Sequence, residues 1–275
     1  MIELPEAVVL ARQINETLSG KRIEQAVANS SPHGFAWYTG DPAEYNQRLA
    51  GKVIGPAAGS AGNIEIVAGD MQLSISAPIR YFAKGEKRPP KHQLNLEFDD
   101  GTGITSSAQM WGGFFCYPLG EKGGFADVDI AKNRPSPLTD AFDRAYFDGL
   151  FNADTPKLSA KAFLATEQRI PGLGNGVLQD ILYHAALHPK SKMGRLSETD
   201  LDALYQAIKS TLTTMAAAGG RDTEKDLYGC SGDYKTVLSS KSKGTPCPIC
   251  GTAIVQAAYL GGNIYTCPTC QVIKK

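Results

Sequence analysis

The first periodic pattern along the chain predicts an amphipathic helix close to the N-terminus. Pro5 suits the first turn of a helix, because its ring presets φ and it lacks an N–H that would have no helical acceptor there. Gly20 suits the end of the helix. Between them, apolar residues recur at helical spacing on one face, namely Ala7, Leu10, Ile14 and Leu18. The residues ahead of Pro5 would form a short arm.

Residues 21–118 change to the alternation of apolar and polar side chains that is typical of half-buried strands. The clearest runs are NIEIVAG (63–69), MQLSISA (71–77) and HQLNLEFDDGTGITSS (92–107). The Asp100-Gly101 pair within the last run is a turn signal. The pattern predicts an antiparallel β-sandwich after the first helix, ending at the proline-punctuated connection 132–140.

From Phe142 onward the pattern is helical. Ser159 can cap the segment AKAFLATEQ, and SETD (197–200) has the spacing of a capping box. The helix that this box introduces carries Leu201, Leu204, Ile208, Leu212 and Met215 at helical spacing. The polar, basic stretch 238–245 is a linker to a last module. We therefore predict an α+β multidomain protein with domains at 1–131, 132–230 and 231–275.

Composition excludes few kinds of protein, but the distribution of charge singles out two basic segments. The chain of 275 residues is 42% hydrophobic and 20% charged, without a run long enough to span a membrane or a secretory leader, so we expect a cytoplasmic protein with no membrane partner. Lys plus Arg equals Asp plus Glu, at 28 each, yet residues 80–92 and 231–275 each hold five basic residues against one acidic residue. These net +4 segments are either solvated surfaces or faces for an anionic partner.

Four cysteines near the C-terminus have the spacing of a zinc site. They form two Cys-x-x-Cys pairs separated by 16 residues: Cys247, Cys250, Cys267 and Cys270. The intervening segment reads as two strands around Gly261-Gly262, which predicts a zinc ribbon. Because the protein fills all four positions, the single Zn²⁺ would be structural. A pair of disulfides or a redox site is the alternative.

The segment PGLGN (171–175) lies between two helical stretches. Gly172 and Gly174 allow a tight turn and a close backbone approach, and a helix beginning near Asn175 would present free N–H groups to an anion such as a DNA phosphate. A purely structural turn between helices remains the alternative on these residues alone.

The order of these features resembles the formamidopyrimidine-DNA glycosylase and endonuclease VIII family of base-excision repair enzymes. The chain shows ELPE (3–6) ahead of a helix, a sandwich, PGLGN with LHP (187–189) beyond it, and a four-cysteine ribbon. The resemblance implies a helix-two-turns-helix domain, a monomer, and binding to damaged or bent double-stranded DNA, with nucleoid association when bound. It also implies a proline nucleophile whose free α-amine attacks the sugar, a following glutamate, a hairpin lysine and a ribbon arginine.

The catalytic positions depart from that pattern. Glu3 matches the family's glutamate, but Ile2 stands where the proline nucleophile belongs. We expect Met1 to be retained before so bulky a residue, which leaves the Ile2 nitrogen as an amide. Alignment places Gly62 at the lysine position and Gly262 at the arginine position. Neither residues 53–79 nor residues 244–273 contain any Lys or Arg.

The positions that would face DNA are better matched. Ile75 falls where an apolar wedge is expected, and Met110 and Trp111, after Gln109, fall where an arginine and an aromatic wedge are expected. Lys91 and His92 match a basic pair at the DNA backbone, Arg80 contributes from the same domain, and Asn175 matches a phosphate contact.

Two hypotheses follow from the sequence. The first is a pseudoenzyme that binds damaged or abasic DNA without cutting it. The second is an active but altered glycosylase or lyase, in which Glu3 activates water or the Met1 amine attacks the sugar.

Overall fold

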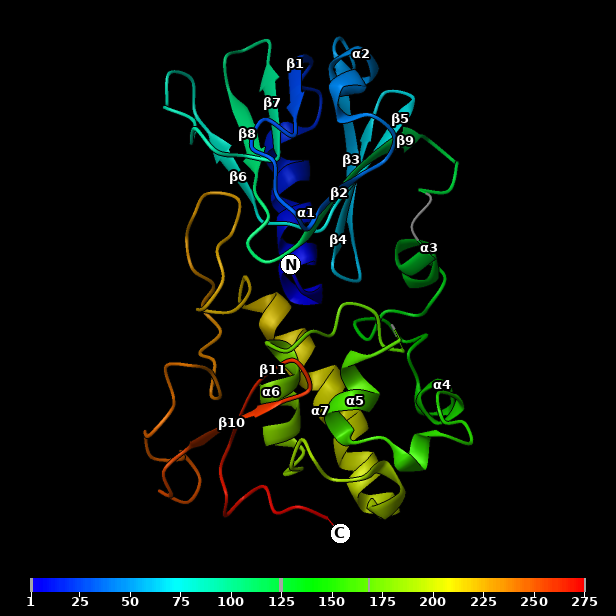
Figure 1. Ribbon diagram of the computed structural model, residues 1–275, viewed down its shortest axis with the longest axis vertical. Coiled ribbons are helices and arrows are strands. Elements are labelled where there is room, and N and C mark those ends of the chain that lie inside the picture. The colour runs from blue at the N-terminus through cyan, green and yellow to red at the C-terminus, as the bar shows by residue number, and fades with distance from the viewer. Residues whose placement is uncertain (1, 124–125, 168, 275) are drawn as a thin grey trace. The chain divides into compact units, whose positions relative to one another are not determined.

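The computed structural model describes residues 2–123, 126–167 and 169–274, and it divides into two compact units (Figure 1). The first unit comprises residues 1–133 and 218–233, and the second comprises residues 134–217 and 234–275. None of the helices in these described ranges is long and apolar enough to cross a membrane.

The first unit consists of a helix and two sheets. Helix α1 (Leu4–Leu18) begins one residue before Pro5 and is followed by Gly20 at φ 83°. One sheet has the strand order β1-β7-β8-β6 and the other has the order β2-β9-β5-β4-β3. All pairs are antiparallel except β2 with β9, so the predicted helix and β-sandwich are confirmed with one parallel edge strand. The four-stranded sheet contains β1 (Ile23–Ala28), β7 (Leu94–Phe98), β8 (Gly103–Ser106) and β6 (Ile79–Phe82). The five-stranded sheet contains β2 (Ala36–Tyr38), β9 (Gly112–Pro118), β5 (Met71–Ile75), β4 (Asn63–Ala68) and β3 (Ile54–Ser60).

Helix α1 packs against β3 at a point where only glycine fits. A Cβ atom on Gly59 would lie 2.6 Å from the backbone nitrogen of Val8 and 2.7 Å from the carbonyl carbon of Ala7. The helix therefore rests directly on the strand backbone, and its apolar face, including Leu10, Ile14 and Leu18, joins the core formed with both sheets. Two short helices, α2 (Tyr45–Leu49) and α3 (Ala126–Lys132), and a 3₁₀ turn (Pro42–Glu44) complete the unit before residue 134.

Residues 218–233 return to the first unit from the end of α7, although the sequence assigned residues up to 230 to the helical domain. The Gln13 amide on α1 donates to Asp226 (2.9 Å) and accepts from the Leu227 backbone N–H (3.0 Å). The Tyr81 N–H on β6 donates to the Leu227 carbonyl (2.8 Å). These long-range bonds fasten the segment to the helix and to a strand.

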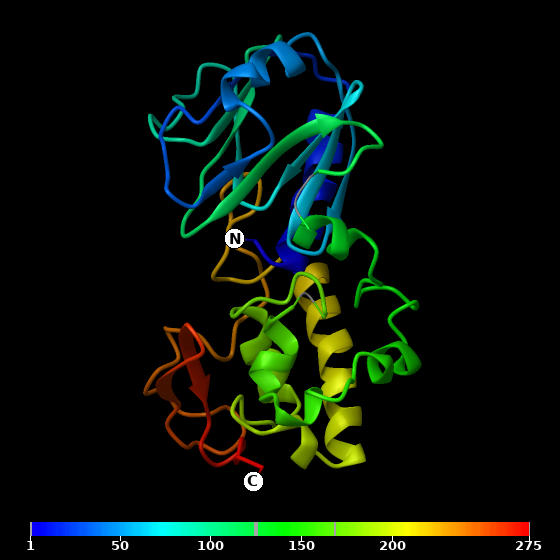
Figure 2. The ribbon, with the colours of Figure 1, turned by 45° about the vertical axis from the view of Figure 1, so that its right-hand side comes forward.

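The second unit is helical with a small hairpin. It contains α4 (Arg144–Gly149), α5 (Ala160–Ala165), α6 (Val177–His184) and α7 (Glu198–Ala217), two 3₁₀ turns (Thr155–Lys157 and Met193–Arg195), and the hairpin β10 (Val255–Tyr259) with β11 (Gly262–Thr266) (Figures 1 and 2). Ser159 caps α5 by accepting from the Ala162 N–H (3.2 Å). Ser197 and Asp200 exchange reciprocal bonds of a capping box at the start of α7. Both predicted caps are thus confirmed.

Candidate functional site

The four cysteines of the second unit converge as predicted. Their sulfur atoms all lie within 4.8 Å of one another, with Cys247 and Cys270 Sγ 3.8 Å apart and Cys250 and Cys267 Sγ 3.4 Å apart. A zinc ion about 2.3 Å from each of four thiolates requires sulfur separations of roughly 3.8 Å. The donor set therefore fits a tetrahedral metal ion held entirely by protein.

The cysteine cluster is built onto helix α6. The side chains of Tyr183, Ile254 and Tyr265 pack with Cys247 and Cys267 in one buried cluster. The Tyr183 hydroxyl lies 3.2 Å from the Cys247 sulfur. A metal in this cluster would consequently fix the ribbon against the helix that follows PGLGN.

The side chain of Asn175 lies at the junction between that helix and the ribbon. Its amide donates to the Asn263 carbonyl on β11 (3.0 Å), and the Gln179 amide on α6 donates to the same carbonyl (3.0 Å). The carbonyl oxygen of the Gln179 side chain accepts from the Tyr265 N–H (3.1 Å). Asn175 is exposed, and α6 begins two residues after it, at Val177, in agreement with the predicted start near Asn175.

One of the two glycines in the turn before Asn175 has a backbone conformation that favours glycine. Gly172 has a φ of 82°, in the left-handed region that favours glycine, and both Gly172 and Gly174 are partly exposed. The segment 172–175 therefore presents backbone and a side-chain amide at the surface beside β11.

A lysine that the sequence analysis did not select lies at the same junction. Lys161 on α5 is only 4% exposed, and its ammonium donates to the Tyr259 carbonyl on β10 (2.7 Å). Burial lowers the pKa of this lysine. A Cβ on Gly262 would lie 3.6 Å from both the Lys161 Nζ and the Asn175 side chain. A cation from α5 thus stands beside the ribbon position at which a family arginine was expected.

The N-terminal arm is buried in the first unit. Ile2 is 4% exposed within the core, and its backbone N–H donates to the Ser76 carbonyl (3.1 Å). Glu3 precedes α1 as its N-cap residue and is 8% exposed. Gly62 lies in the turn between β3 and β4 and is also buried. Ile2, Glu3 and Gly62 are therefore all buried in the first unit.

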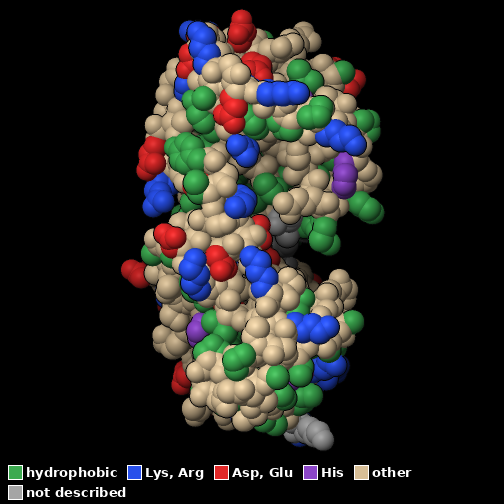
Figure 3. Space-filling model, turned by 90° about the vertical axis from the view of Figure 1, so that its left-hand side faces the viewer, with side chains coloured by type: hydrophobic (Ala, Val, Ile, Leu, Met, Phe, Trp, Pro, Cys, Tyr) green, Lys and Arg blue, Asp and Glu red, His purple; other side chains and the backbone are tan. Residues whose placement is uncertain are grey.

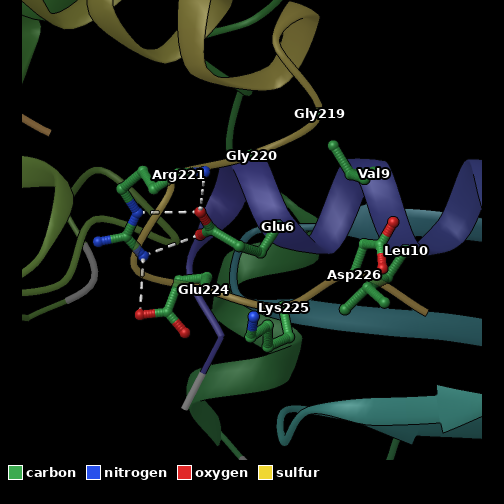
Figure 4. A pocket seen from close by; sticks show the side chains of 9 residues that line it. All are labelled: Glu6, Val9, Leu10, Gly219, Gly220, Arg221, Glu224, Lys225 and Asp226. Carbon is green, nitrogen blue, oxygen red and sulfur yellow. Dashed lines mark hydrogen bonds and ion pairs between the residues drawn. The ribbon is translucent and has the colours of Figure 1, made fainter. Parts of the chain in front are cut away.

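Arg221 is paired with Glu3, Glu6 and Glu224, and Figure 4 shows its contacts with Glu6 and Glu224. Its guanidinium donates from Nε and Nη2 to the two carboxylate oxygens of Glu6 (both 2.9 Å) and lies 3.3 Å from Glu3 and 3.8 Å from Glu224. Burial opposes its charge, but attraction to Glu3 and Glu6 raises the pKa of Arg221 above its ordinary value. Burial raises the pKa of Glu224, against the attraction of Arg221. Sequence patterns gave no signal for this cluster because 215 residues separate its main partners.

The remaining predicted site residues of the first unit differ in exposure. Met110 is 74% exposed and Trp111 is 37% exposed, while the Lys91 and Arg80 side chains are exposed and His92 is partly exposed. Arg80 lies 3.4 Å from Glu86. Ile75 is completely buried, because it lies on the face of β5 that packs into the hydrophobic core, so it is not available as a wedge and that prediction is wrong.

No family model matches the chain. Among curated proteins, the formamidopyrimidine-DNA glycosylase of Chloroflexus aggregans is 28% identical over 283 residues, covering 99% of each chain. The protein of the same name from Gloeobacter violaceus is 24% identical over 282 residues, covering 98% of each chain.

Solved structures of the same kind match the fold. The MutM (Fpg) protein of Thermus thermophilus aligns with a TM-score of 0.80 at 20% identity, covering 99% of this chain and 100% of the other. Lactococcus lactis Fpg in complex with DNA containing an abasic site aligns with a TM-score of 0.80 at 21% identity, covering 98% and 99%. Over nearly its whole length, the chain is therefore similar in sequence to proteins named formamidopyrimidine-DNA glycosylase and shares the fold of solved Fpg structures.

Proposed function

We propose that this protein binds damaged or abasic double-stranded DNA and lacks the amine-dependent base excision and strand cleavage of its family. The relatives are DNA glycosylases by name, and the matched Lactococcus lactis structures contain DNA with an abasic site or a modified base. These likenesses support a role in DNA repair. The residues at the candidate site then indicate whether the protein binds DNA only or also removes bases and cuts the strand.

The carrying observation is the state of the Ile2 nitrogen. With Met1 retained, as we expect, it is a peptide nitrogen, and it donates to the Ser76 carbonyl from a residue that is 4% exposed. A peptide nitrogen shares its lone pair with the adjacent carbonyl, so it cannot form an imine with an abasic sugar. Gly62 and Gly262 supply neither the ammonium nor the guanidinium that the family resemblance implies.

Both units supply residues that we propose to contact DNA. In the second unit, the 172–175 turn and Asn175 offer donors to phosphate, and the Lys161 ammonium adds a positive charge beside them. In the first unit, the side chains of Lys91, His92 and Arg80 would contact the DNA backbone. Met110 and Trp111 would fill the space between two unstacked base pairs.

Basic and acidic side chains are mixed on the surface, which favours a few local contacts with DNA phosphates over long-range attraction to DNA. Figure 3 shows Lys and Arg side chains interspersed with Asp and Glu on one face of the molecule. The chain carries a formal net charge of zero. Affinity would therefore rest on a few phosphate contacts, and each contributes about −0.9 to the slope of log affinity against log salt.

The metal proposed for the cysteine cluster is one structural Zn²⁺ per chain. The Cys247, Cys250, Cys267 and Cys270 sulfurs fill a tetrahedral set, so no open position is left for substrate or water. The metal would hold the β10–β11 hairpin next to Asn175 and Lys161.

An altered glycosylase is the second candidate, and the burial of Glu3 favours it. A carboxylate that is 8% exposed and paired with Arg221 is held in one place, as a base that activates water for excision must be. Such an enzyme would remove a base without forming a covalent intermediate.

The deciding experiment combines trapping with binding. Borohydride is added to the protein with abasic DNA, and strand cleavage is measured in parallel. Base removal is measured separately on duplex DNA with a damaged base, by cutting the resulting abasic sites with alkali. We expect no adduct, no cleavage or base removal above background, and binding that weakens with salt. Robust base removal or cleavage that Glu3→Gln abolishes would overturn the proposal in favour of an altered enzyme.

Variants then test the proposed contacts. Lys91→Ala and Asn175→Ala should weaken binding, and Lys91→Ala should reduce the salt slope by about one unit. Lys122→Ala, which removes an exposed lysine elsewhere on the first unit, is the matched control and should leave the slope unchanged. Binding that is indifferent to salt would contradict the DNA role itself.

A further inference from the structure

Four aromatic rings form a continuous strip on the first unit. His33, Phe35 and Trp37 alternate along the segment that ends in β2, and alternate residues of a strand share a face. Ring centroids are 6.3 Å apart for His33 and Phe35, 6.3 Å for Phe35 and Trp37, and 5.9 Å for Trp37 and Trp111. We call these four residues the aromatic strip.

The aromatic strip is open to solvent. Phe35 is 61% exposed and Trp37 is 39% exposed, and Met110 beside Trp111 is 74% exposed. An open hollow lies next to the strip, lined in part by His33, Trp37 and Tyr38. Large apolar side chains gathered at one exposed place mark an interaction surface rather than a packing requirement.

The surroundings of the strip identify the chemistry of its partner. Hydrogen bonds from the Ser30 hydroxyl (2.8 Å) and the Ser31 N–H (3.2 Å) to the His92 carbonyl bring the segment of Lys91 and His92 against the start of the strip. Residues 29–38, 88–93 and 107–113 contain no Asp or Glu. A cationic edge beside consecutive aromatic faces is the arrangement that binds unpaired nucleic-acid bases, because bases stack on the rings and phosphates meet the cations.

We infer that the aromatic strip stacks unpaired bases of DNA, and that the protein binds damaged DNA with unpaired bases beside the lesion more tightly than fully paired damaged DNA. This inference rests on the proposed function, because Trp111 joins the strip to the surface that would fill the unstacked step. It adds a substrate class, locally unpaired DNA, and two residues, Phe35 and Trp37, that the proposed duplex contacts do not include.

The two tryptophans of the chain, Trp37 and Trp111, are both in the strip, so intrinsic tryptophan fluorescence reports on it directly. A Trp111→Phe variant leaves Trp37 as the single probe. Titration with oligothymidylate should quench its emission, because a stacked base quenches an indole. An unchanged Trp37 signal at saturating oligothymidylate would overturn the inference.

Binding measurements separate this inference from the proposed function. The probes are a duplex with one abasic-site analogue and the same duplex with three unpaired thymines beside that site. Trp37→Ala and Phe35→Ala should each weaken binding to the unpaired probe about tenfold, as expected for loss of one base–aromatic stack, and change duplex binding less than twofold. Trp37→Phe should restore most of the affinity, and Leu119→Ala, which removes a 49% exposed apolar side chain elsewhere on the unit, is the control.

Each outcome has one meaning. Duplex binding without a preference for the unpaired probe overturns the inference and leaves the proposed function standing. Failure to bind either probe overturns both. A Trp37 signal that changes on dilution without DNA would assign the strip to contact between copies of the chain, and would also overturn the inference.

Discussion

Removing the Arg221 guanidinium should destabilise the first unit strongly. The side chains of Arg221 and Glu6 are each 5% exposed and the Glu3 side chain is 10% exposed, so Arg221→Met would leave buried carboxylates without their cation. Breaking a buried ion pair by removing one partner costs about 3–5 kcal/mol. Glu6 would keep a bond of 3.3 Å from the Arg221 backbone N–H, which places the expected loss near the lower limit, at about 3 kcal/mol.

Urea unfolding followed by tryptophan fluorescence measures this loss, because Trp37 and Trp111 both lie in the first unit. With a denaturant slope of roughly 2 kcal/mol per molar, a loss of about 3 kcal/mol moves the midpoint down by about 1.5 M. A shift below about 0.5 M would refute the argument that the cluster is held by a desolvated charge pair.

A second variant distinguishes lost charge pairing from lost packing. Arg221→Met combined with Glu6→Leu removes one uncompensated carboxylate together with the cation, so it should be more stable than Arg221→Met alone by about 1 kcal/mol or more. If the double variant is no more stable than the single one, the cost comes from the shape of the arginine side chain and not from its charge.

Three further predictions follow from the two units. Burial raises the pKa of Glu224 in the folded state, so the protonated carboxyl group stabilises the fold below the unfolded-state pKa, and this stabilisation is lost as pH rises through the folded-state pKa. The urea midpoint of Glu224→Gln should therefore rise relative to that of the wild type as pH increases above about 4.5. Gly59→Ala should cost about 1–3 kcal/mol in thermal or urea unfolding, because its Cβ would overlap the α1 backbone at Val8, whereas Gly51→Ala, with open space around its Cβ, would show the strain of a positive φ alone. Purified protein should contain about one zinc per chain, which Cys267→Ser should remove and Cys230→Ser, outside the cluster, should not; equal zinc content in both variants would contradict the site.

The sequence was informative where structure depends on neighbouring residues. The first helix, the caps at Ser159 and Ser197, and the four cysteines all express local spacing, and each is found as predicted. The alternation of apolar and polar residues likewise predicted the antiparallel β-sandwich. The wedge role of Ile75 was instead taken from the family resemblance, whereas the alternation places Ile75 on the same face of its strand as Leu73, and both side chains are buried.

Contacts between distant residues were not predictable from pattern. Lys161 belongs to an apolar helical segment, and its sequence gives no sign that its ammonium reaches β10, 98 residues later. The Arg221 cluster and the return of residues 218–233 to the first unit depend equally on tertiary packing. Local periodicity fixes which face of an element is apolar, but it does not fix which other element covers that face.

The three altered positions have different surroundings, and each bears on the proposed loss of chemistry. Ile2 is part of the hydrophobic core, Gly62 lies in a buried hairpin turn, and Gly262 lies beside the Lys161 ammonium. At Gly262 a Cβ would meet its neighbours at 3.6 Å, an ordinary contact distance, so space does not exclude a longer side chain there. A guanidinium at that position would instead meet the positive charge of Lys161, and like charges a few ångströms apart repel. The ribbon junction is therefore organised around a buried lysine from α5, and on the proposed function its positive charge lies beside the Asn175 phosphate contact in place of the arginine that the family resemblance implies.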